Sequence, residues 1–402
     1  MSQLDENRRY HSLDQLRAIM MILGLVLHSA VSFTIIPLGR AWPYQDASRH
    51  VLFDVIVTFI HEFRMPLFFL MAGFFTAFLY YRRGPWGLVR NRFLRVGVPF
   101  VLFLAVLLPL TQSGFTYTMS GGARGGSDAA LAYLGNPSGW YERLRTIHLW
   151  FLYYLILFYA VIALAMPVLR RLTRAWSGSV VPRLGRLIHH PVGPFVGAAT
   201  TFLTLLPMRG AGLDTETEFL VQPKILAAYG VFMVFGWVLY LNRREVDGFA
   251  RRAWPFMFAG AAFSAAHIGY SLFVAPQYVL AGKALAALAM WTLIYGFMGL
   301  FVRYYDRPKP LGRYLSDASY WLYLVHLPLT IWLPGLMSGW DVSAFVKSAV
   351  TLTVTAFACL FTYHYLVRST AIGALLNGKR YPRALPRLDE KGRHLPAVAT
   401  AA

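Results

Sequence analysis

Ten apolar stretches alternate with polar links along the chain. They lie near residues 13–36, 51–80, 96–112, 148–169, 194–208, 223–241, 253–274, 281–302, 317–337 and 343–367. A helix of about 20 apolar residues crosses the hydrocarbon core of a bilayer. Because lipid offers no hydrogen-bond partners, the backbone of each stretch must pair with itself, which favours α-helices. The pattern predicts an all-α integral membrane protein with about ten transmembrane helices.

Basic residues gather in alternate links, and this gives the expected orientation. The link after the second stretch holds five arginines between residues 82 and 95, and the C-terminal tail holds seven basic residues. Links of the other parity contain few Lys or Arg residues, and the loop at 208–222 is acidic. Since basic links stay on the cytoplasmic side of a membrane, both termini are expected to face the cytoplasm.

Composition agrees with this class. Hydrophobic residues make up 57% of the 402, charged residues make up 14%, and the mean hydropathy is +0.49, whereas soluble domains carry roughly 25% charged residues. The net charge of +20 is explained by the basic links, so a lipid bilayer rather than nucleic acid is the expected partner. The single cysteine, Cys359, provides neither an internal disulfide nor a thiolate metal site.

The chain is expected to form one polytopic membrane domain over residues 1–368. Residues 369–402 are basic and rich in proline, and they are predicted to form a disordered cytoplasmic tail. The non-cytoplasmic link at 113–147 contains several glycines and is expected to be a flexible loop or a partly ordered lid.

Three ionisable residues in the first stretch share one helix face. Arg17 and His28 are eleven residues apart, which is about 20° off the same face and ~16 Å along a helix axis. Asp14 lies three positions before Arg17 and joins that face. The sequence therefore predicts a polar stripe from the cytoplasmic mouth at Arg17 to the membrane centre at His28.

Further ionisable residues are expected at the depth of His28. His61 and Arg64 lie about ten to thirteen residues into the second stretch, and His326 lies about ten residues into the ninth. Charged and titratable side chains inside a membrane are energetically unfavourable and are typical of functional sites. The four side chains are predicted to form one layer near the bilayer midplane.

Besides a functional site, two other interpretations of this layer remain open. The first is a structural polar network that holds the helices together, in which Arg64 pairs with Glu62 or Asp14. The second is a metal site, which is less favoured than the polar network. The histidines lack the helical spacing of a pair of metal ligands, and no carboxylate is placed to complete the ligand set. No metal is expected.

The layout suits transfer of a group from a phosphate-bearing donor to a hydroxyl. A histidine serves as a general base near neutral pH, and guanidinium groups bind phosphates through paired hydrogen bonds. Arg17, Arg92 and Arg95 would then hold the donor on the cytoplasmic side. Positive-inside topology is the alternative explanation for Arg92 and Arg95.

The motifs of this chain resemble those of the membrane acyltransferase-3 family. That family shows an arginine, ten residues and a histidine, here Arg17 and His28, within "RRYHSLDQLRAIMMILGLVLHSAVSF". The stretch "NRFLRVGVP" is similar to its basic Arg-x-x-Arg loop, and "HLWFLYYL" and "SDASYWLYLVHLPL" are similar to later blocks. Within the family, "FIHEFRMPLFFLMAGFF" is most similar to the branch that succinylates periplasmic glucans in Gram-negative bacteria.

The resemblance implies a multi-pass O-acyltransferase of the bacterial inner membrane. The donor would be acyl-CoA, either succinyl-CoA or acetyl-CoA, on the cytoplasmic side. The acceptor would be a hydroxyl of a periplasmic glucan or of a surface polysaccharide. No feature of the sequence specifies the oligomeric state or separates direct transfer from an acyl-histidine intermediate.

Roles for individual residues follow from the same resemblance. His28 is expected to be the general base, and Arg17, next to Asp14, is expected to position the donor or the histidine. From their predicted depth alone, and not from the resemblance, Arg64 or His326 is expected to stabilise the oxyanion or to orient His28. The substrate-binding residues are expected to be His61, His148 and Trp150.

The rival class is a proton-coupled transporter or flippase of a carbohydrate or lipid-linked substrate. In such a protein the midplane histidines would relay protons, and the substrate would move without covalent change. A multi-spanning scaffold or receptor is a third class, but it leaves the buried charged layer without a purpose. Aromatic residues near the non-cytoplasmic face, including Trp42 and Tyr44, either contact sugar or form an interfacial aromatic belt.

Overall fold

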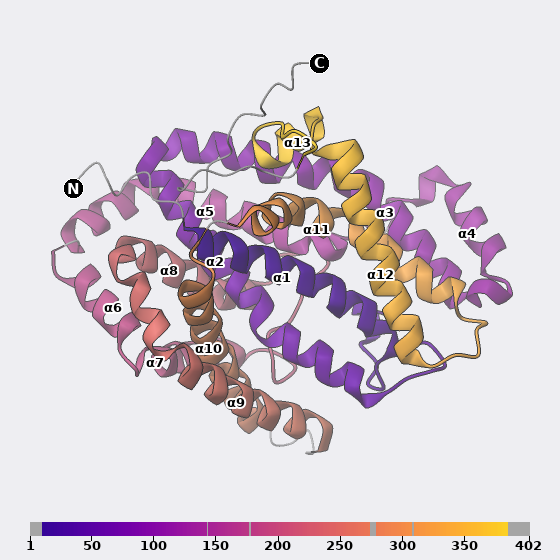
Figure 1. Cartoon of the computed structure of the whole chain (residues 1–402), viewed down its shortest axis with the longest axis horizontal. Helices are drawn as coiled ribbons and strands as arrows, with labels where there is room; N and C mark the ends of the chain where they lie inside the picture. The colour runs from indigo at the N-terminus through magenta and orange to yellow at the C-terminus, as the bar shows by residue number, and fades with distance from the viewer. Residues whose placement is uncertain (1–9, 143, 177, 274–278, 308, 385–402) are drawn as a thin grey trace.

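The chain forms a helical bundle, which we describe from a computed structural model (Figure 1). The structure describes residues 10–142, 144–176, 178–273, 279–307 and 309–384. Within these ranges the secondary structure is helical, and the one recorded β-bridge joins Arg145 to Glu218 without forming a strand. The predicted all-α class is confirmed.

Helices occupy all ten of the predicted stretches. These helices are α1 (His11–Ala30), α2 (Val51–Arg92), α3 (Val98–Met119), α5 (Trp150–Trp176), α7 (Gly193–Leu205), α8 (Pro223–Leu241), α9 (Ala253–Phe273), α10 (Val279–Tyr304), α11 (Pro310–Leu336) and α12 (Ala344–Thr362). Proline occupies one of the first two positions of α3, α7, α8 and α11, where its missing N–H disrupts no helical hydrogen bond.

Three further helices lie in segments predicted as links or tail. They are α4 (Gly126–Leu134), α6 (Val180–His189) and α13 (Ala371–Asn377). Helix α13 falls within the segment predicted to be a disordered tail, so that prediction is wrong for its first part. Residues 385–402 of that tail lie outside the described residues, and the domain boundary at 368 stays a prediction.

Seven helical segments of the described chain are long and apolar enough to cross a membrane. One of them, Val51–Met119, is counted once although it contains both α2 and α3. Two helices of the predicted stretches are not among the seven, namely α7, which has only 13 residues, and α11. The protein is therefore a multi-pass membrane protein by its helices. The predicted number of ten crossings stays a prediction, as does the cytoplasmic location of the termini.

The basic link after the second stretch is helical rather than a loop. Helix α2 continues to Arg92 with one break at Gly84, whose φ of 70° lies in the left-handed region that favours glycine. Pro85 then restarts the helix, since its fixed φ suits a first helical turn. The π-helical turn η4 (Phe93–Gly97) connects α2 to α3, so the arginines of this link lie on a defined helical surface.

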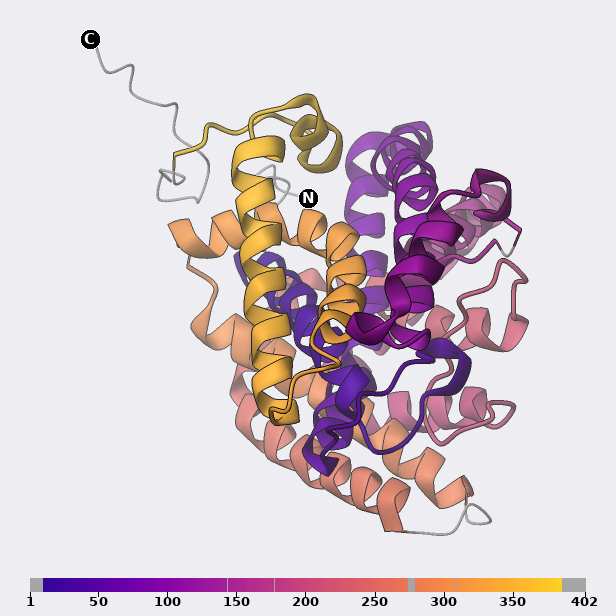
Figure 2. The same cartoon turned by 90° about the vertical axis from the view of Figure 1, so that its right-hand side faces the viewer.

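Helix α1 lies at the centre of the bundle, where it packs against α2, α10, α11 and α12 (Figures 1 and 2). Helices α2 and α8 approach closely at two glycines. A side chain at Gly73 would collide with the Met233 carbonyl, and one at Gly236 would collide with the Leu70 carbonyl. Small residues at such crossings allow helices in membranes to pack backbone to backbone.

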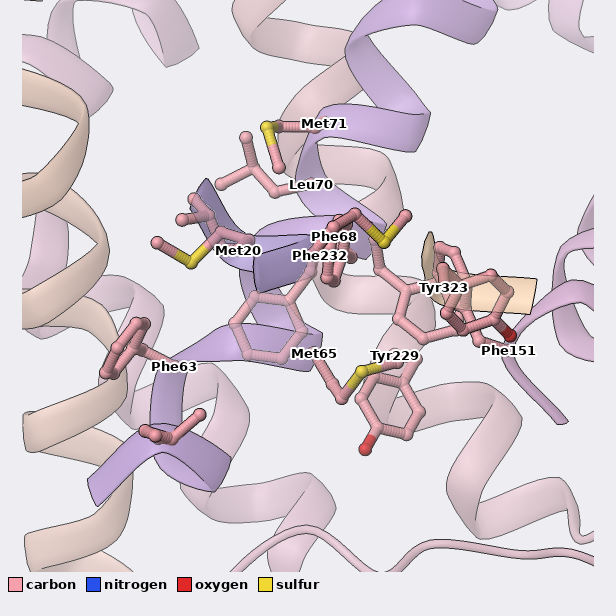
Figure 3. Close-up of a cluster of buried hydrophobic side chains, with 14 of the residues drawn as sticks. Met20, Phe63, Met65, Phe68, Leu70, Met71, Phe151, Tyr229, Phe232 and Tyr323 are labelled. Carbon is pink, nitrogen blue, oxygen red and sulfur yellow. The ribbon is translucent and has the colours of Figure 1, made fainter. Parts of the chain in front are cut away.

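Large apolar side chains fill the space between these helices. Figure 3 shows part of this core, where Met20 of α1 lies near Phe63, Phe68 and Leu70 of α2. The cluster extends to α5, α8 and α11 through its other labelled members, which include Phe151, Tyr229, Phe232 and Tyr323. This apolar core surrounds the polar residues described next.

Candidate active site

Three histidine rings form a row at the centre of the bundle. The ring centroids of His28 and His326 are 5.1 Å apart, and those of His326 and His148 are also 5.1 Å apart. His28 comes from α1, His326 from α11, and His148 from the short helix η7 (Ile147–Leu149) that precedes α5. We call these three residues the histidine row.

Main-chain carbonyls set the tautomers of two members of the row. His326 Nδ1 lies 3.0 Å from the Leu322 oxygen and 2.8 Å from the Tyr323 oxygen. His148 Nε2 lies 3.1 Å from the Tyr323 oxygen and 3.0 Å from the Leu324 oxygen. A carbonyl only accepts hydrogen bonds, so these nitrogens carry the protons, and in the neutral rings the other nitrogens are lone-pair acceptors.

One further ring nitrogen of each histidine is buried without a partner. These atoms are His28 Nδ1, His148 Nδ1 and His326 Nε2. Buried polar atoms in proteins nearly always have a hydrogen-bond partner, and an exception indicates a functional role or a missing ligand. The histidine row therefore offers proton-accepting nitrogens to a group that enters from outside the chain.

Arg64 of α2 lies beside this row. Its Nε donates to the Met20 carbonyl at 2.9 Å, and its guanidinium lies over the Phe68 ring at 5.6 Å. Gly24 of α1 leaves room for it, because any side chain there would overlap the guanidinium. Arg64 is close enough to His28 for their charges to interact. The site thus combines proton acceptors with one buried cation.

Glu62 pairs with α9 rather than with Arg64. Ser264 Oγ donates to one oxygen of the Glu62 carboxylate, and His267 Nδ1 lies 2.6 Å from the other. All three side chains are buried. The alternative in which Arg64 pairs with Glu62 is wrong, and Asp14 lies instead beside Arg17 and Arg313, as described below. Sequence reasoning missed the roles of Ser264 and His267.

His61 reaches the acidic loop. Its Nε2 lies 3.4 Å from the Leu213 carbonyl in the 208–222 loop, and its ring lies within electrostatic range of His28. The four residues predicted to share one layer, which include Arg64 and His326, are therefore brought together. His148 belongs to the same cluster, whereas its neighbour Trp150 does not.

Trp150 lies instead in an aromatic cluster. Its ring is 5.5 Å from Tyr229 and 6.0 Å from Tyr154, with Phe69 at 6.2 Å. These contacts make it part of the apolar core drawn around Tyr229 in Figure 3. The structure gives no support to its predicted role in substrate binding.

Trp42 stacks on His28. The two rings are nearly parallel, with centroids 5.7 Å apart and an interplanar angle of 26°. The indole N–H of Trp42 donates to Ser32 Oγ at 2.9 Å, and Phe115 packs edge-on at 5.3 Å. Trp42 is thus fixed next to the histidine row rather than in an interfacial belt.

The loop that carries Trp42 is anchored by two carboxylates. Asp46 forms a buried ion pair with Lys347 of α12, at 2.9 Å, and Asp54 accepts hydrogen bonds from two N–H groups of the loop. Tyr44 donates to Asp46 at 3.2 Å. Burial and the Asp46 carboxylate raise the pKa of Tyr44 above its ordinary value, so its hydroxyl stays protonated and keeps donating at neutral pH.

Arg17 lies on α1, about three helical turns from His28. Its guanidinium is 3.8 Å from Asp14 and 5.8 Å from the centre of the Phe75 ring. Arg313 of α11 also approaches Asp14, at 3.8 Å, and binds Asp317 at 2.7 Å. Asp14 is therefore shared between two arginines, and 40% of the Arg17 side chain remains exposed.

Arg92 and Arg95 form a second basic group with Arg83. Their positive charges act on one another, and Arg92 lies over the ring of Tyr159 of α5 at 5.1 Å. The Nε atom of Arg92 is buried without a partner. Within the part of the chain that the structure describes, neither Arg92 nor Arg95 has a carboxylate partner.

Among the described residues, no three His, Cys, Asp or Glu side chains gather in an arrangement that could hold a metal ion. The histidine row supplies nitrogen acceptors from three different elements, with an arginine beside them. This set can accept a proton and stabilise a developing negative charge, which are the two requirements of acyl transfer to a hydroxyl.

A family model described as an acyltransferase domain matches residues 10–364. The match spans most of the chain and includes the histidine row, Arg64 and the arginines at 92 and 95. The fold and this match define a membrane protein that transfers acyl groups. The chain belongs to the acyltransferase-3 family, in agreement with the resemblance of its motifs.

The curated relatives include glucans biosynthesis protein C from several strains of Escherichia coli. The protein from strain O1:K1 / APEC is 24% identical over 387 residues, which cover 92% of this chain and 95% of the relative. The protein from strain K12 is 24% identical over 392 residues, with the same coverage. No solved structure matches the chain.

Proposed function

We propose that this protein transfers an acyl group from cytoplasmic acyl-CoA to a hydroxyl of a periplasmic glucan or surface polysaccharide, with His28 as the general base. The observation that carries the proposal is the buried Nδ1 of His28, which has no partner and lies next to His326 and Arg64. Glucan is favoured as acceptor because relatives that match nearly the whole chain are named glucans biosynthesis protein C.

The transfer requires one base, one cation and a donor that spans half the membrane. Arg17 and His28 lie on the same continuous helix, about 16 Å apart along its axis. Phosphates held by Arg17, Arg92 and Arg95 at the cytoplasmic end would place the thioester of an extended donor near His28. Succinyl-CoA and acetyl-CoA both have this form.

The chemistry then proceeds in one balanced exchange. His28 takes the proton of the sugar hydroxyl, and the sugar oxygen attacks the thioester carbonyl. The carbon–sulfur bond breaks, and the leaving thiolate takes the proton back from the histidine, which gives an ester and free coenzyme A. An Arg64 N–H stabilises the negative charge that develops on the carbonyl oxygen.

The tautomer of His326 assigns it a different role from that of Arg64. Its free nitrogen, Nε2, is a lone-pair acceptor in the neutral ring, so it cannot donate to an oxyanion. It can accept a hydrogen bond from an N–H of His28 or from the incoming hydroxyl. We therefore assign orientation of the base or acceptor to His326, and oxyanion stabilisation to Arg64.

The proposed orientation has ten membrane crossings in the bacterial inner membrane, with both termini in the cytoplasm. The main support for this orientation is a contact between residues 145–146 and residues 217–218, two segments that it places on the same, non-cytoplasmic side. Thr146 N donates to the Thr217 carbonyl at 2.7 Å, and Arg145 lies 3.7 Å from Glu218. Helices α5 and α7 lie between these segments in sequence, which fits a chain that crosses the membrane with α5 and returns with α7.

Periplasmic glucans from cells with and without the protein test the function. Mass spectrometry is expected to show glucan carrying succinyl groups only when the protein is present. The His28→Ala variant is expected to lose at least about 100-fold in activity, since general-base catalysis contributes 10²–10⁴-fold. The exposed His190 on the cytoplasmic link provides a control, because His190→Ala should retain full activity.

An increase in glucan mass of the size of an acetyl group would identify acetyl-CoA as the donor, and the proposed mechanism would still apply. Full activity of an inserted His28→Ala variant would contradict the mechanism. A transporter remains the second candidate because three adjacent histidines suit proton transfer. The N–H groups of His148 and His326 are bound to main-chain carbonyls, however, so a proton cannot pass through either ring unless those hydrogen bonds break.

A further inference from the structure

The C-terminal segment is docked on the cytoplasmic end of the bundle. Tyr381 is buried, and its N–H donates to the Arg368 carbonyl at 3.0 Å. Arg313 donates to the Tyr381 hydroxyl at 2.9 Å, and Arg368 Nε donates to the Pro382 carbonyl at 2.8 Å. The segment from α13 to Pro382 is therefore part of the folded domain, although its composition predicts disorder.

Arg368 is the anchor of this segment. Its side chain is fully buried, and the rings of Tyr314, Tyr363 and Tyr381 surround its guanidinium at 4.8, 5.9 and 5.3 Å. Asp317 approaches it at 3.8 Å. Cations over tyrosine faces are stabilised most strongly when they are withdrawn from water, so this contact fixes the position of α13.

The end of α13 lies against Arg95. Gly378 follows the helix with a φ of 85°, and its N–H donates to the Ala374 carbonyl at 2.8 Å. A side chain at Gly378 would overlap the Arg95 guanidinium. The carbonyl end of a helix carries partial negative charge and attracts cations. Arg95 is thus held at the C-terminus of α13, which also contacts η4 (Figures 1 and 2).

Three arginines concentrate positive charge next to the end of α13. Arg83, Arg92 and Arg95 repel one another, and no described carboxylate pairs with Arg92 or Arg95. Lys379, directly after Gly378, is exposed and lies over the Tyr381 ring at 5.1 Å. Like charges held together without partners are unfavourable, and a bound polyanion removes the repulsion.

We propose that the C-terminal end of α13 completes a polyphosphate-binding site. Gly378 keeps Arg95 in place, and Lys379 adds a further cation to those of Arg92 and Arg95. The inference rests on the proposed function in one respect, namely that the polyphosphate belongs to the acyl-CoA donor. It adds the C-terminal segment to a site that the sequence placed only on the arginines of α1 and the α2–α3 link.

Binding to the full-length protein in detergent tests the site. Isothermal titration calorimetry would use two probes, coenzyme A and inorganic pyrophosphate. Gly378→Ala is expected to weaken both by about tenfold, because displacing Arg95 removes a charge-assisted hydrogen bond. Gly39→Ala is the matched control: Gly39 also has a positive φ, of 57°, and a side chain there meets nothing within 4 Å.

Lys379→Gln provides a second variant, at an exposed position, and its thermal unfolding temperature is measured alongside. It is expected to weaken both probes about threefold or more, as loss of one exposed phosphate contact would. The neighbouring exposed Arg380 is its control, and Arg380→Gln should bind like the unmodified protein. In acyl-transfer assays, Gly378→Ala and Lys379→Gln should raise KM for acyl-CoA and leave kcat unchanged.

The outcomes separate this site from the proposed function. Unchanged binding in both Gly378→Ala and Lys379→Gln overturns the role of α13, even if the protein binds coenzyme A. Binding of pyrophosphate that both variants weaken, without binding of coenzyme A, supports the site and contradicts the proposed donor. Failure of the unmodified protein to bind either probe overturns both. A lowered kcat with unchanged KM would contradict a role in binding.

Discussion

The imidazole of His326 is held by its own helix, because the carbonyls of Leu322 and Tyr323 accept from Nδ1. Two substitutions by amide residues distinguish the contributions of its two ring nitrogens to activity. Asparagine keeps a donor at the Nδ1 position and has no atom at Nε2, whereas glutamine extends an amide to the Nε2 position. The pair therefore tests whether the acceptor at Nε2 contributes to catalysis.

His326→Asn is expected to lower kcat by about 100-fold, the lower end of the range for loss of a proton-transfer group. His326→Gln should retain more activity, because its amide oxygen can accept a hydrogen bond where Nε2 did. Acyl transfer by purified protein in detergent, with the thermal unfolding temperature of each variant, provides the measurement. Equal activities for the two variants would assign His326 a purely structural role.

At the residue scale, the sequence predicted most members of the site but not their partners. Ionisable residues in apolar stretches are visible in any sequence, and this identified His28, His61, Arg64 and His326. Nothing in the spacing showed that Glu62 would turn toward α9, because the partner lies about 200 residues away. The stacking of Trp42 on His28 depends on how a loop folds back, which periodicity does not reveal.

At the element scale, Glu62 connects α2 to α9. Helix α9 is mostly exposed on the outside of the bundle, and Ser264 and His267 are among its few buried residues. Glu62→Leu would leave both polar groups without their partner. The variant is expected to lower stability by about 1–2 kcal/mol, because hydrogen bonds between membrane helices contribute that much at most.

Thermal unfolding of the purified protein in detergent measures this loss. The combined variant Glu62→Leu, Ser264→Ala and His267→Leu is expected to recover most of the stability, because replacing every member of a buried polar group removes the unpaired atoms. If the combined variant were less stable than Glu62→Leu alone, the network would contribute more than a helix-to-helix connection.

The helices themselves were the most predictable part of the fold. Each of the ten apolar stretches is helical because a lipid-exposed backbone has no other way to pair its polar groups. Helix α13 was missed because it is short and lies in a proline-rich, basic context. It is stabilised by contacts of Tyr381 and Arg368 with distant elements, and composition does not report such contacts.

At the scale of the whole molecule, the number of crossings depends in part on α7. With 13 residues, this helix is ~20 Å long, against ~30 Å for the hydrocarbon core. Single-cysteine labelling decides whether it crosses. The native Cys359 is buried and is first replaced by serine; cysteines are then introduced as Ser138→Cys, Ser179→Cys, Gly210→Cys and Ala384→Cys.

A membrane-impermeant maleimide added to spheroplasts is expected to label the positions at Ser138 and Gly210. It should reach those at Ser179 and Ala384 only after the membrane is opened. These four results would show that α5 and α7 both cross and that the C-terminus is cytoplasmic. Labelling of Ser179 and Gly210 from the same side would show that α7 does not cross.

The ion pair between Asp46 and Lys347 affects how the protein is made. Ribosomes add ~5–20 residues per second, so the 301 residues between the partners take roughly 15–60 s to synthesise. During that interval Asp46 lacks the Lys347 ammonium. The loop that stacks Trp42 on His28 is therefore not yet anchored to α12. The candidate site around His28 is therefore completed only when the last long helix is inserted, and a nascent chain released before α12 is expected to be inactive.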